Sequence, residues 1–170
     1  MLRTAYIGLG ANVDSTAGAP AQTVVAAMDA LSALGEVTER SSLYATEPVG
    51  YRDQPAFVNA VAALRTELEA EELLAGLLGI ERRFGRDRSA SVPKGPRTLD
   101  LDLLLLDDVV AESETLTLPH PELTRRRFVL APLAEIAPEL RHPLTGKTVE
   151  AMLAELPDEG ANARDAVKAC

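Results

Sequence analysis

Cysteine is nearly absent from this chain: of its 170 residues only Cys170, the last, is a cysteine. The sequence therefore excludes an internal disulfide and a cysteine-rich metal site. Long hydrophobic runs are missing too, since no apolar stretch approaches the ~20 residues that a membrane span needs. The first residues also show no signal-peptide pattern. We accordingly expect a cytoplasmic protein that does not enter a membrane.

Positive charge is in deficit, with 17 Lys and Arg against 26 Asp and Glu and a net charge of −9. This balance argues against a general nucleic-acid binder. Between residues 81 and 97, however, the acidic residues are only Glu81 and Asp87. The basic residues of this stretch are Arg82, Arg83, Arg86, Arg88, Lys94 and Arg97. A basic segment within an acidic protein predicts a pocket for a small anionic ligand.

One domain accounts for most of the chain. A length of 170 residues with 46% hydrophobic residues suffices for a single ample core. After Pro157 the sequence is alanine-rich and charged, and it has little to bury. We expect a domain at residues 1–157 and a mobile tail at 158–170.

The order of predicted elements is typical of one architecture. Strands are predicted at residues 3–9, 37–44 and 57–66 and from residue 99 onward, and helices at 20–34, 69–84, 124–136 and 149–156. The first six elements follow the order strand, helix, strand, strand, helix, strand. This order describes an α+β fold of the ferredoxin-like, split βαβ type, with the helices packed on one face of a mainly antiparallel sheet. The glycines of the segment GLGAN, residues 8–12, are predicted to form a tight turn, because the third glycine of a dinucleotide fingerprint is missing.

Two carboxylates share one face of the strand that begins at Leu99. Side chains alternate along a strand, so Asp100 and Asp102 point one way, with Cα atoms ~6–7 Å apart. The residues predicted on the other face are Leu99, Leu101, Leu103 and Leu105. Two like charges this close are costly to bury without a cation, and carboxylate oxygens suit Mg²⁺. With Arg97 as a phosphate ligand, the stretch indicates magnesium-dependent phosphoryl chemistry; the alternative is a solvated face on which Arg97 pairs with one aspartate.

The strand at 57–66 also has two different faces. Phe57 and Asn59 share one face, where an aromatic ring and an amide can stack on and hydrogen-bond a flat heterocycle. The alternative is that Phe57 belongs to the core and Asn59 lies near a strand end. In the predicted fold, the face without helices carries Phe57, Asn59, Asp100 and Asp102 together.

Six motifs follow one another between residue 6 and about residue 138. They are YIGLGAN at 6–12, SSLYAT at 41–46, DQPAFVNA at 53–60, GPRTLDLD at 95–102, PHP at 119–121 and RRF at 126–128. Together they resemble the 6-hydroxymethyl-7,8-dihydropterin pyrophosphokinases, folate-pathway enzymes that move a pyrophosphoryl group from ATP to a pterin alcohol and release AMP. The GPRTLDLD segment is the most specific of the six.

The resemblance implies a role for individual residues. Asp100 and Asp102 would hold two Mg²⁺ ions between the ATP phosphates and the pterin hydroxyl. The pterin ring would lie between Phe57 and Phe128, with Asn59 and the backbone from Thr46 to Val49 reading its edge. The residues implied for ATP are Glu81, Arg86, Arg88, Arg97, Thr117, His120 and Arg126, and the catalytic set is Arg86, Arg97, Asp100 and Asp102.

One departure from the family lies just before Gly95. Members usually have a basic residue and often a tryptophan there, whereas this chain has Pro93 and Lys94. The residues alone also leave other classes open: a noncatalytic ferredoxin-like binding module, a kinase that transfers one phosphate, and a nucleotidyltransferase. We expect a monomeric, Mg²⁺-dependent diphosphokinase that binds ATP and hydroxymethyldihydropterin and does not bind nucleic acid.

Overall fold

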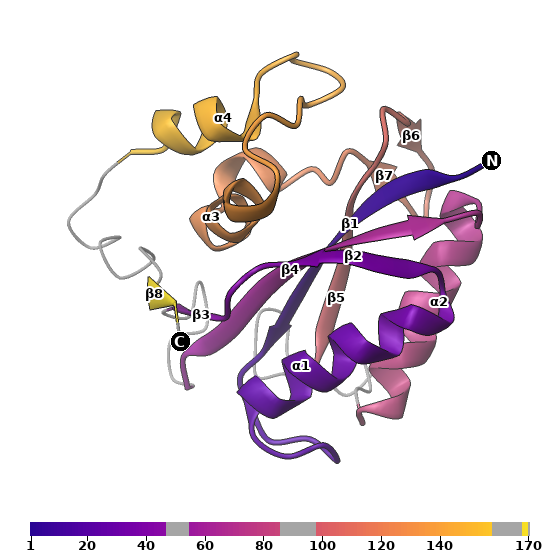
Figure 1. Cartoon of the computed structure of the whole chain (residues 1–170), viewed down its shortest axis with the longest axis vertical. Coiled ribbons are helices and arrows are strands. Elements are labelled where there is room, and N and C mark those ends of the chain that lie inside the picture. The colour runs from indigo at the N-terminus through magenta and orange to yellow at the C-terminus, as the bar shows by residue number, and fades with distance from the viewer. Residues whose placement is uncertain (47–54, 86–97, 158–167, 170) are drawn as a thin grey trace.

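A computed structural model describes residues 1–46, 55–85, 98–157 and 168–169 (Figure 1). Within these residues the main sheet has the strand order β5-β1-β4-β3-β8, and β2 also pairs with β4. Every pairing is antiparallel. The strands are β1 (Arg3–Ala11), β2 (Glu36–Arg40), β3 (Tyr44–Thr46), β4 (Phe57–Thr66), β5 (Asp100–Leu106) and β8 (Lys168–Ala169). This order and connectivity confirm the ferredoxin-like α+β fold.

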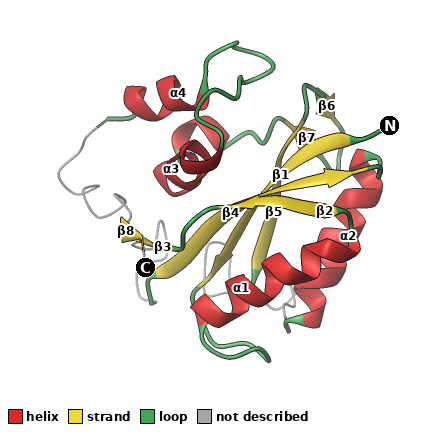
Figure 2. Ribbon diagram, in the orientation of Figure 1, coloured by secondary structure: helices red, strands yellow, loops and turns green. Residues whose placement is uncertain are grey.

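Helices lie on both sides of this sheet (Figure 2). The two helices of the βαββαβ unit, α1 (Pro20–Ala30) and α2 (Ala70–Arg83), share one face, as predicted. Beyond that unit, α3 (Arg127–Ile136) and α4 (Val149–Glu155) pack on part of the opposite face. The remaining short elements are η1 (Leu31–Ala33), η2 (Leu123–Arg125) and the hairpin of β6 (Ala111–Glu112) and β7 (Thr117–Leu118). No helix in the described ranges is long and apolar enough to span a bilayer.

Two hydrophobic cores follow from the strand alternation. Along β4, Ala60, Ala62 and Leu64 face α1 and α2, whereas Val61 faces α3 and α4. The second core is formed mainly by Val61, Leu104, Leu105, Leu123, Val129, Leu130, Leu133, Val149 and Met152. It covers the carboxyl-terminal half of β5 and leaves the half that begins at Asp100 to the site.

The sequence-based prediction for Leu105 was wrong. Leu103 lies opposite Ile7, but Leu105 lies opposite Tyr6, so β5 has one extra residue there. An extra residue in one strand is a β-bulge, and it reverses the alternation beyond it. Leu105 therefore packs in the second core and Leu106 in the first.

Two segment boundaries also differ from prediction. The glycines at 8 and 10 do not form a turn, because β1 continues as a strand through Ala11. The second predicted strand is divided into β2 and β3, and Ser41 bridges the division: its backbone N–H donates to the Val61 carbonyl at 2.9 Å, and its Oγ accepts from the Val61 N–H at 2.8 Å.

The predicted helices at 20–34, 69–84 and 149–156 are present with ends shifted by a few residues. The predicted helix at 124–136 is interrupted at Arg126, between η2 and α3, and Pro132 lies inside α3. In the predicted tail, residues 158–167 and 170 lie outside the described residues, and Lys168–Ala169 pair with β3.

Candidate active site

A row of residues crosses four neighbouring strands on one side of the sheet. Asp100 of β5 lies opposite Gly10 of β1, and Gly10 lies opposite Asn59 of β4. On the other edge of β4, Tyr44 of β3 lies opposite Asn59. Asp102 is on the same side, two residues farther along β5. We call this surface, with Phe57, the site face; it is the face on which the sequence predicted these side chains.

Gly10 makes the approach of Asn59 to the aspartate strand possible. A Cβ at position 10 would lie 2.7 Å from Asn59 Oδ1, so the Asn59 amide lies over the Gly10 backbone. Asn59 is also buried, with 8% of the residue exposed. No side chain therefore separates Asn59 from Asp100 across β1. The row therefore brings an amide and a carboxylate to neighbouring strands on one face of the sheet.

His120 closes the aspartate end of the site face. Its Nε2 lies 3.9 Å from Asp102 Oδ1, and its Nδ1 accepts a hydrogen bond from the Glu122 backbone N–H at 3.1 Å. In the neutral imidazole the proton is therefore on Nε2, which faces Asp102. Burial lowers the pKa of His120, as does the charge of Arg126, while Asp100 and Glu122 oppose the shift. The uncharged ring thus offers an N–H donor at the carboxylate pair.

Arg126 and Phe128 stand at the beginning of α3. Arg126 is the N-cap residue, and its Cζ lies 5.5 Å from the centroid of the Phe128 ring. That distance is within the range of a cation–π contact. Phe128 is partly buried against the second core. The helix therefore presents a cation and a ring side by side, and the cation acts electrostatically on His120.

Glu81 supports the aspartate pair from below. It lies on α2 and is 1% exposed, and its Oε2 accepts a hydrogen bond from the Leu101 N–H at 2.7 Å. Leu101 is the residue between the two aspartates. The contact therefore fixes the backbone that carries both carboxylates. Its implied role toward the nucleotide stays a prediction, as does that of Thr117, which is exposed on β7 beside β5.

Several residues that the sequence assigned to ligands are not described. Val49, Arg86, Arg88 and Arg97 lie outside the described residues, and Thr46 is placed only as a backbone position of β3 opposite Phe57. Of the residues predicted to bind phosphate, only His120 and Arg126 are therefore described.

The carboxylate pair fits a cation that brings most of its own ligands. In the described part of the chain, no group of three or more His, Cys, Asp or Glu side chains could hold a metal ion. Asp100 and Asp102 are both partly exposed on one strand face. Mg²⁺ commonly takes one or two carboxylates and completes its shell with water and phosphate oxygens. The donor set therefore fits Mg²⁺ bound together with a phosphate ligand and does not form a cage for a metal ion alone.

Two contacts near the site face were not predicted from sequence. Asn12, 2% exposed, donates from Nδ2 to the Pro55 carbonyl at 3.0 Å and so fixes the backbone just before β4. Glu135 of α3 accepts hydrogen bonds from Ser42 and Tyr44. The only signal was that Asn12, Ser42 and Tyr44 fall within the recognised motifs.

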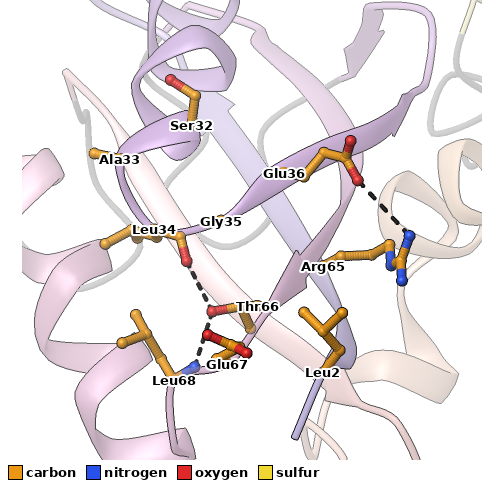
Figure 3. A pocket seen from close by; sticks show the side chains of 10 residues that line it. All are labelled: Leu2, Ser32, Ala33, Leu34, Gly35, Glu36, Arg65, Thr66, Glu67 and Leu68. Atoms are coloured by element: carbon orange, nitrogen blue, oxygen red, sulfur yellow. Dashed lines mark hydrogen bonds and ion pairs between the residues drawn. The ribbon is translucent and has the colours of Figure 1, made fainter.

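A separate hollow of about 540 Å³ is lined by residues from η1, the beginning of β2 and the end of β4 (Figure 3). Gly35 and Thr66 are among the residues that line it. Thr66 pairs with Arg3, which is seven residues from Gly10 along β1. At ~3.3 Å per residue this is about 23 Å from the row with Asp100. On its rim the Arg65–Glu36 ion pair measures 3.8 Å, and Thr66 Oγ1 donates to the Leu34 carbonyl at 2.7 Å. None of these groups belongs to the site face.

Comparison with known proteins identifies what this arrangement is similar to. A family model described as 7,8-dihydro-6-hydroxymethylpterin-pyrophosphokinase (HPPK) matches residues 6–138. The 2-amino-4-hydroxy-6-hydroxymethyldihydropteridine pyrophosphokinase of Pseudomonas aeruginosa is 42% identical, covering 94% of this chain and 96% of that protein. The Bacillus subtilis protein of the same name is 43% identical, with 85% and 84% covered.

Longer proteins match as well. The Folic acid synthesis protein fol1 of Schizosaccharomyces pombe is 38% identical over 93% of this chain, but the chain spans only 21% of it. A crystal structure of wild-type Plasmodium falciparum HPPK-DHPS with pteroate superposes with a TM-score of 0.70 at 14% identity, covering 91% of this chain and 42% of that one. This structural likeness supports the fold.

Proposed function

The chain belongs to the 7,8-dihydro-6-hydroxymethylpterin-pyrophosphokinase family, and we propose that its site face transfers pyrophosphate from ATP to 6-hydroxymethyl-7,8-dihydropterin in folate biosynthesis. The row Asp100–Gly10–Asn59 supports this proposal, because its carboxylate and amide lie on either side of β1 at a glycine, with no side chain between them. The pterin occupies the Asn59 end, and the ATP phosphates occupy the aspartate end.

The pterin half of the site consists of two rings and an amide. Phe57 shares the strand face with Asn59, and Phe128 comes from α3, which packs on the same side of the sheet. A flat heterocycle between two aromatic rings gains from stacking and from burial of both faces. The Asn59 amide supplies both a donor and an acceptor to the ring edge, and the backbone at Thr46–Val49 completes that edge.

The phosphate half is polarised by charge. Asp100 and Asp102 hold Mg²⁺, two ions in our proposal, with the remaining ligands from water and ATP. When bound, Mg²⁺ neutralises phosphate charge and lowers the barrier to attack by the pterin hydroxyl. Asp100 and Asn59 lie opposite the same glycine of β1, so we assign Asp100 to orient that hydroxyl.

Basic groups bind the phosphate oxygens that face away from the aspartates. Arg126 and the Nε2–H of His120 are the described donors, and we assign Arg86, Arg88 and Arg97 to the same task, with Arg86 and Arg97 acting on the transferred group. We assign Glu81 and Thr117 to the nucleotide. Since phosphoryl transfer depends mainly on positioning and charge neutralisation, removal of one donor reduces the rate without abolishing the reaction.

The products distinguish this reaction from its alternatives. The protein incubated with ATP, Mg²⁺ and hydroxymethyldihydropterin should form AMP and the pterin diphosphate. ADP would indicate transfer of one phosphate, inorganic pyrophosphate would indicate nucleotidyl transfer, and unchanged ATP would indicate a binding module. Chelation of Mg²⁺ should stop AMP formation, and activity that persists in chelator would refute the metal assignment.

We also propose that the active form is a cytoplasmic monomer whose catalytic unit is residues 1–157. All residues that we assign to the ligands lie between Thr46 and Phe128, within residues 1–157. The chain has one cysteine and so needs no oxidising compartment for disulfides. Sedimentation at assay concentration would test the oligomeric state, and a chain ending at residue 157 that keeps full activity would support the catalytic boundary.

A further inference from the structure

Glu135, near the end of α3, gathers three donors from one segment of the sheet edge. Its carboxylate accepts from the Ser42 backbone N–H at 3.0 and 3.1 Å and from Ser42 Oγ at 2.8 Å. The Tyr44 hydroxyl donates to Glu135 Oε1 at 2.5 Å. The two partners are 93 and 91 residues away along the chain. One carboxylate thus joins α3 to the beginning of β3.

The position of Glu135 on α3 relates this contact to Phe128. The two residues are seven apart, which is two helical turns, so they lie on the same side of the helix ~10 Å from each other. Between them, Val129, Leu130 and Leu133 pack on the second core. Apolar packing is non-directional and tolerates small rotations of a helix. A hydrogen-bonded contact at the far end restricts that rotation.

The other side of the contact leads directly to the pterin half of the site. Tyr44 is the first residue of β3 and lies opposite Asn59, and two residues later Thr46 lies opposite Phe57. Glu135 is therefore bound to the strand that pairs with the amide and ring of β4. The helix that carries Glu135 also carries the other predicted ring, Phe128, on the same side of the sheet.

We propose that Glu135 is a positioning residue for the pterin: it fixes α3 relative to β3, and so sets the spacing and orientation of Phe128 against Phe57 and Asn59. This rests on the proposed function of the site face. Glu135 contacts neither reacting atoms nor phosphate ligands in the proposal. Its loss should loosen pterin binding far more than ATP binding, because α3 contributes only Arg126 to the ATP half.

Charge strengthens the contact under assay conditions. Burial raises the pKa of Glu135, but the hydrogen bonds from Tyr44 and Ser42 outweigh this, and the net result is a lowered pKa. The group is therefore ionised at neutral pH. Hydrogen bonds to an ionised acceptor are shorter and stronger than neutral ones, which suits a contact that must hold an orientation.

The test measures the KM for each substrate separately. AMP formation by the wild-type protein is established first, since its absence would refute the proposed function and not the role of Glu135. Glu135→Ala should then raise the KM for hydroxymethyldihydropterin about tenfold, the equivalent of one charge-assisted hydrogen bond, with the KM for ATP within about twofold. An unchanged pterin KM, or equal increases for both substrates, would overturn the proposal.

Graded variants and a matched control keep the test decisive. Tyr44→Phe removes one donor and keeps the ring, and Glu135→Gln keeps an acceptor without the charge, so both should give smaller increases for pterin alone. They also serve if Glu135→Ala does not fold. The control is Asp29→Ala, because Asp29 joins α1, on the opposite face of the sheet, to Arg40 at the end of β2, two residues before Ser42, at 2.7 Å. It should lower stability without the KM difference; the same difference in this control would refute a specific role of Glu135.

Discussion

A methyl group added at Gly10 should damage the site, whereas the same change two residues earlier should not. At Gly10 the new Cβ would lie 2.7 Å from Asn59 Oδ1, and ordinary contact begins at 3.4 Å, so the amide must withdraw by about 0.7 Å. At Gly8 the nearest atoms are methyls of Leu104 at 3.5 Å, which is already ordinary contact. Both positions are on the site face of β1, so the pair is matched in strand and in side.

The magnitudes follow from what must move. Overpacking against one side-chain end costs ~1 kcal/mol or slightly more, so Gly10→Ala should still fold. A displacement near 1 Å of a substrate-positioning group can cost up to ~100-fold, so we expect the pterin KM to rise at least about tenfold. Gly8→Ala should keep activity within about twofold, and its stability should be equal or higher by ~0.5 kcal/mol, since glycine is unfavourable within strands.

A double-mutant cycle locates the cause. If Gly10→Ala acts through the Asn59 amide, it should add almost nothing once Asn59 is already alanine, because the clash is then gone. Steady-state KM values for pterin and ATP, with unfolding midpoints for each variant, complete the cycle. Full pterin affinity in Gly10→Ala, or additive effects in the double variant, would refute the reasoning.

Three further changes have definite expected outcomes. Asp102→Ala should lower turnover by several orders of magnitude with no loss of stability without ligand, because a like-charged neighbour is removed; near-normal turnover would exclude the metal assignment. Phe128→Ala should raise the KM for pterin far more than the KM for ATP, and equal effects would place the pterin elsewhere. His142, 6% exposed, accepts from the Leu144 and Thr145 N–H groups through Nδ1, and burial lowers its pKa from 6.5. Its contribution is therefore complete above pH 6.5 and declines as the pH falls below it, so denaturant titrations should show a shallower acid decline in His142→Asn, with part of the decline remaining from His120.

The alternation of side chains predicted the site face because it is a local property. Phe57 with Asn59, and Asp100 with Asp102, are each two residues apart on a strand, so only the strand assignment was needed. The same rule failed at Leu105, where the bulge opposite Tyr6 reversed the faces. Four consecutive leucines at 103–106 fit either face equally well, so the sequence had no polar residue to reveal the shift.

Gly10 and Glu135 show why the rest was beyond sequence reasoning. Glycine is common in turns, and the segment at 8–12 was therefore interpreted as one, but here glycine allows a neighbouring strand's amide to lie over the backbone. That requirement comes from Asn59, 49 positions later. Glu135 contacts Ser42 over a separation of 93 residues. Neither contact leaves a local pattern, and both depend on which elements the fold brings together.

The second helical layer explains why the site lies at one end of the sheet. On the face opposite α1 and α2, the apolar residues Val61, Leu104 and Leu105 are covered by α3 and α4. On this face β5 has Asp100 and Asp102 first and Leu104 and Leu105 later, so α3 and α4 cover the strand only beyond Asp102. With α1 and α2 as its only helices, the sheet would expose all of this face to water. By covering the apolar half, α3 fixes the edge of the polar half and also brings Phe128 and Arg126 to that edge, which is why one helix can affect both the stability of the sheet and the shape of its binding site.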